Sequence, residues 1–144
     1  RLHALMLIDI DNFKSVNDTY GHAVGDTVLI KLAAVLQRAC RENDIVMRLG
    51  GDEFAMYLPG MPDKAQAESF FKRLFTQIDK ISIPEMQGEK INVSLGASLC
   101  SDKDGATFDT LYHKADAAMY ESKKIEGNHS IIYSDLPQER QTPL

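Results

Sequence analysis

Carboxylates that follow two short apolar segments are the residues in this chain best suited to chemistry. The apolar run at residues 4–8 ends in Asp9, and a Gly50-Gly51 turn is followed directly by Asp52 and Glu53. An acid that ends a buried strand needs a partner such as a cation. If Asp52 and Glu53 begin a strand they point to opposite faces, so at least one faces whatever the sheet covers. A ligand site and an ordinary solvated hairpin tip both remain open here, because Gly-Gly and acidic residues are common in turns.

The first apolar segment adds features that favour a ligand with phosphates. If the two strands are neighbours, Asp9 and Asp52 meet at one edge of the sheet, where hard oxygen ligands with open positions suit Mg²⁺ or Mn²⁺. The backbone N–H groups of residues 12–14 begin a short helix, which attracts anions, and Lys14 adds positive charge. Asp11 can instead cap that helix. Together these features predict a metal-assisted site for a nucleoside triphosphate.

Apolar periodicity predicts the elements that position these residues. Strands are expected at 4–8, 45–47, 54–58, 91–99 and 131–133, and helices at 12–16, 25–39, 63–80 and 107–124. This order predicts an α+β fold, a ferredoxin-like antiparallel-centred sheet with helices on one face. Gly96, inside a predicted strand, indicates close approach of another backbone or of a ligand. Residues 1–133 are expected to form one domain, and the polar residues 134–144 a tail or linker.

Composition narrows the function classes. The net charge of −5 argues against a surface that coats DNA, although a local basic pocket for one nucleotide remains compatible with it. Cys40 and Cys100 are isolated, which favours reduced thiols over a disulfide or zinc site. The sequence contains no apolar run of about 20 residues and no signal peptide, so we expect a cytoplasmic domain without membrane contact. Because the chain opens directly in a predicted strand, we expect it to be a piece of a longer protein.

Several motifs together resemble those of the GGDEF family of diguanylate cyclases over residues 4–133. In chain order they are DIDNFK at 9–14, ND at 17–18, GH at 21–22, GD at 25–26, RLGGDEF at 48–54, SLG at 94–96 and ADAAMYESK at 115–123. Each motif alone is weak, but their order and spacing are specific. The resemblance implies a fold of the nucleotidyl-cyclase and polymerase-palm type. It also implies condensation of two GTP into cyclic di-GMP with loss of two pyrophosphates, in a homodimer whose domains each present one GTP.

The same resemblance implies roles for individual residues. Mg²⁺ or Mn²⁺ would be held by Asp9, the Ile10 carbonyl and Asp52, and either Asp52 or Glu53 would be the general base. The positions implied to bind GTP are Asn12, Phe13, Lys14, Asn17, His22, Asp26, Gly50, Gly51 and Lys123. Among them, Asn17 and Asp26 would recognise guanine, because a carboxylate accepts from its N1–H and N2–H₂ edge whereas adenine presents an acceptor at N1. Lys123 would reach the β- and γ-phosphates.

The stretch at residues 41–44 matches the RxxD inhibitory site of the family. Arg41 and Asp44 would bind cyclic di-GMP there, with Arg73 or its neighbour Lys72 as a further contact. Arg and Asp are common at helix ends, so the pattern gains weight only from its fixed distance to the Gly50-Gly51 turn.

The chain also departs from the family pattern. Gly127 stands where the family has an arginine that contacts the triphosphate, and Lys124 would replace that charge only in part. The family's preceding Leu-Thr-Gly-Leu and Asn-Arg-Arg segment is absent from the sequence. The first interpretation is therefore an active cyclase that is inhibited by its product, with attached sensor or phosphodiesterase domains. The alternative is a GGDEF domain that binds GTP or cyclic di-GMP and regulates a partner domain without making product.

Overall fold

The apolar run near the start of the chain forms β1 (Leu2–Ile10), the central strand of a five-stranded sheet. The structure is a computed structural model and describes residues 1–141. β1 is buried on both faces, with residues 4–8 fully buried. A continuous apolar strand of this kind requires cover on both sides.

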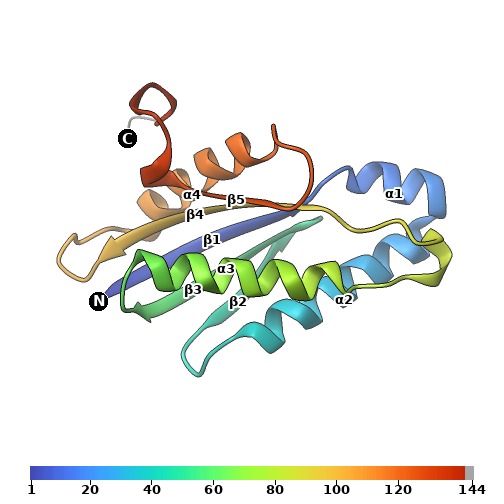
Figure 1. The fold of residues 1–144 in the computed structure, drawn as a ribbon, viewed down its shortest axis with the longest axis horizontal. Helices are drawn as coiled ribbons and strands as arrows, with labels where there is room; N and C mark the ends of the chain where they lie inside the picture. The colour runs from blue at the N-terminus through green and yellow to red at the C-terminus, as the bar shows by residue number, and fades with distance from the viewer. Residues whose placement is uncertain (142–144) are drawn as a thin grey trace.

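The remaining elements follow in the predicted order (Figure 1). They are α1 (Phe13–Tyr20), α2 (His22–Ala39), β2 (Ile45–Gly50), β3 (Glu53–Met61), α3 (Lys64–Asp79), β4 (Val93–Ser101), α4 (Phe108–Ser122) and β5 (His129–Ile132). The sheet order is β2-β3-β1-β4-β5; β5 pairs parallel to β4, and the other pairs are antiparallel. The antiparallel-centred α+β fold is confirmed.

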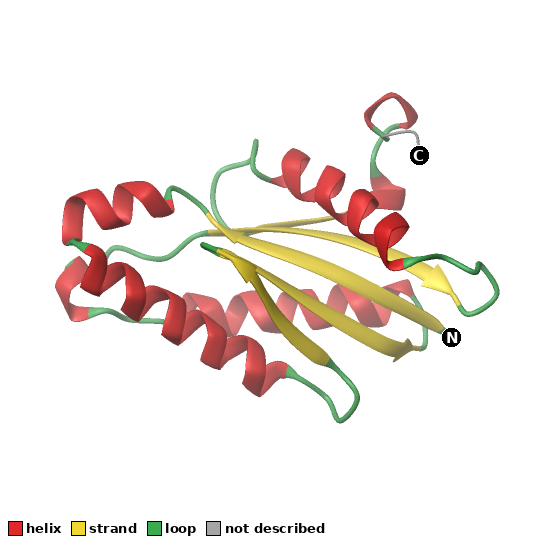
Figure 2. Ribbon diagram, turned by 180° about the vertical axis from the view of Figure 1, so that it is seen from behind, coloured by secondary structure: helices red, strands yellow, loops and turns green. Residues whose placement is uncertain are grey.

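The expectation that the helices lie on one face is wrong. Met6 and Ile8 of β1 pack in a core with residues of α2 and α3, whereas Leu5 and Leu7 pack against α4. Figures 1 and 2 show α4 on one side of the sheet and α2 and α3 on the other. Because side chains alternate along a strand, both apolar faces of β1 are covered by this arrangement.

The chain after β5 lies against the domain as far as it is described. Residues 133–135 and 138–140 form short 3₁₀ turns, and Leu136 between them is buried. Lys64 of α3 pairs with Asp135, and Glu121 of α4 pairs with Arg140. The domain limit at residue 133 therefore stays a prediction, and residues 142–144 of the expected tail lie outside the described part of the chain. Within residues 1–141, no helix is both long and apolar enough to cross a membrane.

Gly96 of β4 brings the backbone of α4 close to the sheet, which confirms the expected close approach. A Cβ at this position would lie 2.1 Å from the Met119 nitrogen and 2.3 Å from the Ala115 oxygen. Both atoms belong to the main chain, so the clash cannot be relieved by a rotamer change. Glycine at this position thus fixes how near α4, and the residues it carries, lie to the sheet.

Gly96→Ala is expected to lower the free energy of unfolding by about 3 kcal/mol, because α4 must move away from β4. Urea unfolding followed by circular dichroism measures this change. The control is Gly88→Ala, where a Cβ meets no atom within 4 Å but φ is +87°. That variant should lose only about 1–2 kcal/mol through backbone strain. If both variants lose the same free energy of unfolding, α4 moves away from β4 without a loss of stability.

Candidate active site

The turn between β2 and β3 places two carboxylates beside the C-terminal end of β1. Gly50 and Gly51 have φ of +139° and +51°, which a glycine adopts without steric penalty. Arg48 closes the turn, because its Nε and Nη2 donate to the Gly51 oxygen at 3.1 and 2.7 Å. The Ile10 nitrogen donates to the Asp52 oxygen at 3.4 Å. Arg48 thus closes the turn on itself, and the Ile10 hydrogen bond joins the turn to β1.

Asp9, Asp52 and Lys123 form the charged centre of this region. Asp9 is only 8% exposed, and Lys123, which follows α4, donates to its Oδ2. Its Oδ1 is buried without a hydrogen-bond partner in the described part of the protein. Asp52 lies within hydrogen-bonding reach of Asp9 when the Asp52 carboxyl is protonated. The prediction that Asp9 and Asp52 meet at one end of the sheet is therefore correct.

The pKa values of Asp52 and Lys123 are shifted because these charged groups lie close to Asp9 and are partly buried. Burial, the hydrogen bond to Asp9 and the charge of Asp9 raise the pKa of Asp52 to about 6. Burial by itself lowers the pKa of Lys123, but its hydrogen bond to Asp9 and the nearby carboxylates outweigh this, so the pKa is raised. The cluster holds excess negative charge and favours binding of a proton or a cation.

The oxygens present suit a hard divalent cation. The unpartnered Asp9 Oδ1 and the proton-sharing Asp52 supply two carboxylates, and the carbonyl of Ile10 lies next to Asp9 in sequence. Residues 1–141 contain no cluster of three or more His, Cys, Asp or Glu side chains placed to hold a metal. Mg²⁺ commonly binds through one or two carboxylates and completes its shell with water and substrate phosphates, so this small ligand set fits it.

Asp11 does not cap α1, so that alternative is wrong. The Asp11 Oδ1 atom accepts a hydrogen bond from the hydroxyl of Ser94, a residue of β4, at 2.7 Å. Burial raises the pKa of Asp11, although the Ser94 hydrogen bond and Lys123 oppose this shift. The N-cap of α1 is Asn12, whose φ of +55° is left-handed and whose side chain makes no capping bond. Asn12 thus turns the chain sharply from β1 into α1, beside the carboxylates.

The residues expected to recognise guanine lie together where α1 meets α2. α2 begins at His22, earlier than the predicted start at residue 25, and His22 and Asp26 are exposed. The Asn17 side chain packs against Gly25, where an added Cβ would lie 1.8 Å from its Oδ1. Only glycine leaves room for Asn17 beside Asp26. The neighbouring side chains are therefore arranged as a polar corner open to solvent.

Of the two residues expected beside the phosphates, only one is packed. Phe13 is partly buried against the main core. Lys14 is exposed and pairs with Asp18 at 3.1 Å along α1. The structure therefore does not bring the Lys14 ammonium to Asp9 and Asp52, and Lys123 is the cation found there.

Comparison with known proteins decides the family. The family model described as "Diguanylate cyclase, GGDEF domain" matches residues 1–129. The chain belongs to the GGDEF diguanylate cyclase family. Diguanylate cyclase A of Treponema denticola is 37% identical to this GGDEF domain over 137 residues, covering 94% of the chain and 36% of that protein. The uncharacterized protein YtrP of Bacillus subtilis is also 37% identical, over 131 residues that cover 91% of the chain and 22% of YtrP. The domain thus spans well under half of these relatives.

Solved structures agree with this assignment. The GGDEF domain of DgcB from Caulobacter crescentus, determined in complex with c-di-GMP, superposes with a TM-score of 0.84 at 28% identity. The match covers 93% of the present chain and 79% of the DgcB chain. The α+β arrangement of this GGDEF domain is therefore the one found in its structural relatives.

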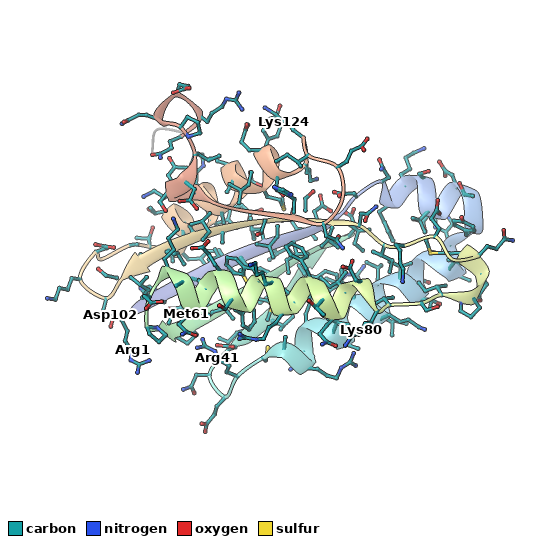
Figure 3. The ribbon with its side chains drawn as sticks, in the orientation of Figure 1. Arg1, Arg41, Met61, Lys80, Asp102 and Lys124 are labelled. Carbon is teal, nitrogen blue, oxygen red and sulfur yellow. The ribbon has the colours of Figure 1, made fainter. Side chains whose placement is uncertain are left out.

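Lys124, the residue expected to replace the missing arginine charge in part, does not line the cavity beside Gly127. A cavity of about 440 Å³ beside Lys123 is lined by Glu126 and Gly127, among others. Lys124 instead donates to Glu121 at 2.9 Å and lies 4.8 Å from the ring centre of Tyr120. Figure 3 shows it at the outer end of α4. Of the two neighbouring lysines, only Lys123 lines this cavity, and position 127 adds no charge to it.

Arg41 of the RxxD pattern lines a groove between α2 and α3. Arg41 donates to both oxygens of Asp44, at 2.9 and 2.8 Å, and to the Pro59 oxygen at 2.7 Å. The Asp44 side chain is only 1% exposed. Arg41 and Arg73 line the same cavity of about 380 Å³, whereas Lys72 lines a different cavity beside β5. Of the two expected further contacts, the geometry therefore favours Arg73.

Three contacts in this GGDEF domain were not anticipated from its sequence. They involve Arg48, which closes the turn, Ser94, which bonds Asp11, and Tyr112, whose hydroxyl donates to Glu53 Oε1 at 3.1 Å. Arg48 lies inside the glycine motif, and its position alone could have suggested the first contact. The other two join strands and helices that are far apart in the chain, and no local pattern signals them.

Proposed function

We propose that this domain condenses two molecules of GTP into cyclic di-GMP and releases two pyrophosphates. The observation that carries the proposal is the cluster of Asp9, Asp52 and Lys123 at the end of β1, beside the start of α1. Because each domain holds one GTP, the reaction requires two copies facing each other. We assign the domain to the cytoplasm, where GTP is available, and expect sensor or phosphodiesterase domains in the same protein.

The residues divide the work of binding and catalysis. Asp9, the Ile10 carbonyl and Asp52 would hold Mg²⁺ or Mn²⁺, which supplies charge neutralisation of the triphosphate and favours loss of the 3′-hydroxyl proton. The turn at Gly50 and Gly51 leaves room for the nucleotide, since a Cβ at either position meets only open space.

The remaining residues orient the nucleotide. Asn17 and Asp26 recognise guanine from the corner between α1 and α2, with His22 and Phe13 beside them. The backbone at Asn12 attracts phosphate at the start of α1, and Lys14 would leave its exposed pair with Asp18 to add its charge there. Lys123 moves from Asp9 to the β- and γ-phosphates when the nucleotide binds. Either Asp52 or Glu53 takes the proton from the attacking 3′-hydroxyl.

A regulatory binding module is the second candidate. The observation that favours it is Gly127, together with the pairing of Lys124 to Glu121, because the triphosphate loses a charge-assisted contact. Such a contact contributes about 1.5–3 kcal/mol, which weakens GTP binding without removing the catalytic carboxylates.

One assay separates the two candidates. The purified chain is incubated with GTP and Mg²⁺, and the products are chromatographed, with Asp52→Asn as the inactive control. Cyclic di-GMP from the wild type but not from the variant supports the cyclase. No product at high protein concentration, with GTP binding retained, would replace the cyclase with the regulatory module.

Product inhibition through the groove between α2 and α3 belongs to the same proposal. Cyclic di-GMP would be bound at the site of Arg41, Asp44 and Arg73, with Arg41 and Arg73 facing the ligand and the buried Asp44 orienting Arg41. Arg73→Met should weaken its affinity about tenfold, because one charge-assisted contact to phosphate is lost while the Arg41–Asp44 pair stays intact. Isothermal titration calorimetry with cyclic di-GMP measures this loss.

Lys72→Met is the matched control, since Lys72 carries the same charge on the adjacent position but lines another cavity. Its affinity for cyclic di-GMP should equal that of the wild type. Equal affinities for both variants would place the ligand elsewhere.

A further inference from the structure

Tyr112 of α4 makes a contact with the site that no role so far explains. Its hydroxyl donates to Glu53 Oε1 at 3.1 Å, in a partly buried position. Its ring lies 6.0 Å from that of Phe108, one turn earlier, which restricts its orientation. Burial, the charge of Glu53 and this hydrogen bond raise the pKa of Tyr112, so the hydroxyl stays protonated as a donor at neutral pH. One carboxylate oxygen of Glu53, Oε1, is thus bound by Tyr112.

The register of the sheet explains why Glu53 needs such a partner. Glu53 of β3 pairs directly with Asp9 of β1, so the two side chains lie on the same face. Like charges in directly opposed positions destabilise each other. α4 covers this face: its Tyr112 binds Glu53, and Lys123, the residue directly after the helix, binds Asp9. The two binding residues are eleven positions apart, about three helical turns. α4 thereby draws the two opposed carboxylates in different directions.

We infer that Tyr112 is a positioning residue that holds the Glu53 carboxylate apart from Asp9 and oriented for the reaction, an inference that rests on the proposed cyclase function. Two observations support this role: the direct hydrogen bond from Tyr112 to Glu53, and the pairing of Glu53 opposite Asp9 on neighbouring strands. Tyr112 acts through Glu53 and needs no contact with the nucleotide.

The test is Tyr112→Phe, which keeps the ring and removes only the donor. The turnover rate with GTP and Mg²⁺ should fall about tenfold or more, a cost typical of lost orienting contacts to catalytic groups. The affinity for α,β-methylene GTP, an unreactive analogue, should change less than about twofold. The double variant that combines Tyr112→Phe with Glu53→Gln should lose no more activity than Glu53→Gln alone. Tyr112 acts through Glu53, so the effects of the two substitutions should not add.

Tyr57→Phe is the matched control. Its hydroxyl bonds the His3 Nδ1 at 2.8 Å, away from the catalytic carboxylates. This variant should turn over like the wild type. If Tyr112→Phe also turns over like the wild type, or if its loss multiplies with that of Glu53→Gln, the inference is overturned while the cyclase function stands.

A second measurement does not need turnover. The ring of Tyr112 is followed by NMR through a pH titration of the wild type and of Glu53→Gln. Its pKa should fall toward the ordinary tyrosine value in the variant, because the charge of Glu53 is one cause of the raised value. An unchanged titration of Tyr112 would overturn the inference even if the chain makes no product.

Discussion

Asp52→Asn is expected to abolish formation of cyclic di-GMP and, at the same time, to raise the melting temperature of the cation-free domain at pH 7.5. The loss of activity follows because the variant has a neutral amide in place of an anionic metal ligand and lacks a candidate base. Such a loss corresponds to several kcal/mol, or about 10²- to 10³-fold in rate. Chromatography of the GTP reaction measures it.

The gain in stability follows from the pKa of Asp52. Its pKa of about 6 in the folded protein lies above the ordinary value of 3.8 for this side chain. Between these two values the folded state binds more protons than the unfolded state, so stability falls as the pH rises from about 4 to about 6 and stays low above that. An amide cannot ionise and avoids this cost, which we put at about 1 kcal/mol because the side chain is partly solvated.

Scanning calorimetry in the presence of EDTA measures the difference in melting temperature between Asp52→Asn and the wild type. At pH 7.5 the variant should melt about 3 °C above the wild type, and the gap should close near pH 4. Asp102→Asn removes the same charge from an exposed position near the opposite end of β1, which Figure 3 labels beside Arg1. That control should change neither activity nor melting temperature. A variant at Asp52 that melts no higher than the wild type would show that Asp52 ionises without penalty.

Gly127→Arg is expected to tighten GTP binding about tenfold or more. An arginine there would meet open space beside the cavity next to Lys123, and a charge-assisted contact to phosphate contributes about 1.5–3 kcal/mol. Calorimetric titration with α,β-methylene GTP measures the affinity without turnover.

The backbone at this position requires a matched control. Gly127 has φ of +85°, so any side chain there is strained by about 1–2 kcal/mol. Gly127→Ala carries the same strain without the charge, so both variants should melt below the wild type and only the arginine should bind GTP more tightly. Equal GTP affinities for the two variants would mean that another cation already fills this role.

The sequence was sufficient to predict the order of the elements and most of the charged centre. The apolar run before Asp9 and the glycine turn before Asp52 are local signals, and their meeting required only that β1 and β3 be neighbours. The face that α4 covers was not predictable in this way. Its apolar stripe shows that one side is buried, but periodicity carries no information on which side of the sheet receives it.

Two hydrogen bonds at the site were also not predictable from the sequence. The bonds from Ser94 to Asp11 and from Tyr112 to Glu53 depend on the crossing of α4 and on strand register, which arise only in the folded chain. The start of α2 at His22 was missed because Gly25, a weak helix former, lies in its first turns. There glycine serves the packing of Asn17, so a tertiary requirement overrides local preference.

The ion pair between Lys123 and Asp9 has a practical consequence for work on the purified domain. Because the ammonium already compensates the buried carboxylate, chelators should leave the domain folded, and removal of divalent ions should not prevent refolding. If GTP and Mg²⁺ raise the melting temperature, the rise then measures binding of these ligands to a domain that is already folded. It does not reflect folding of the site around the metal. Thermal shift measurements can therefore serve as a binding assay for this domain.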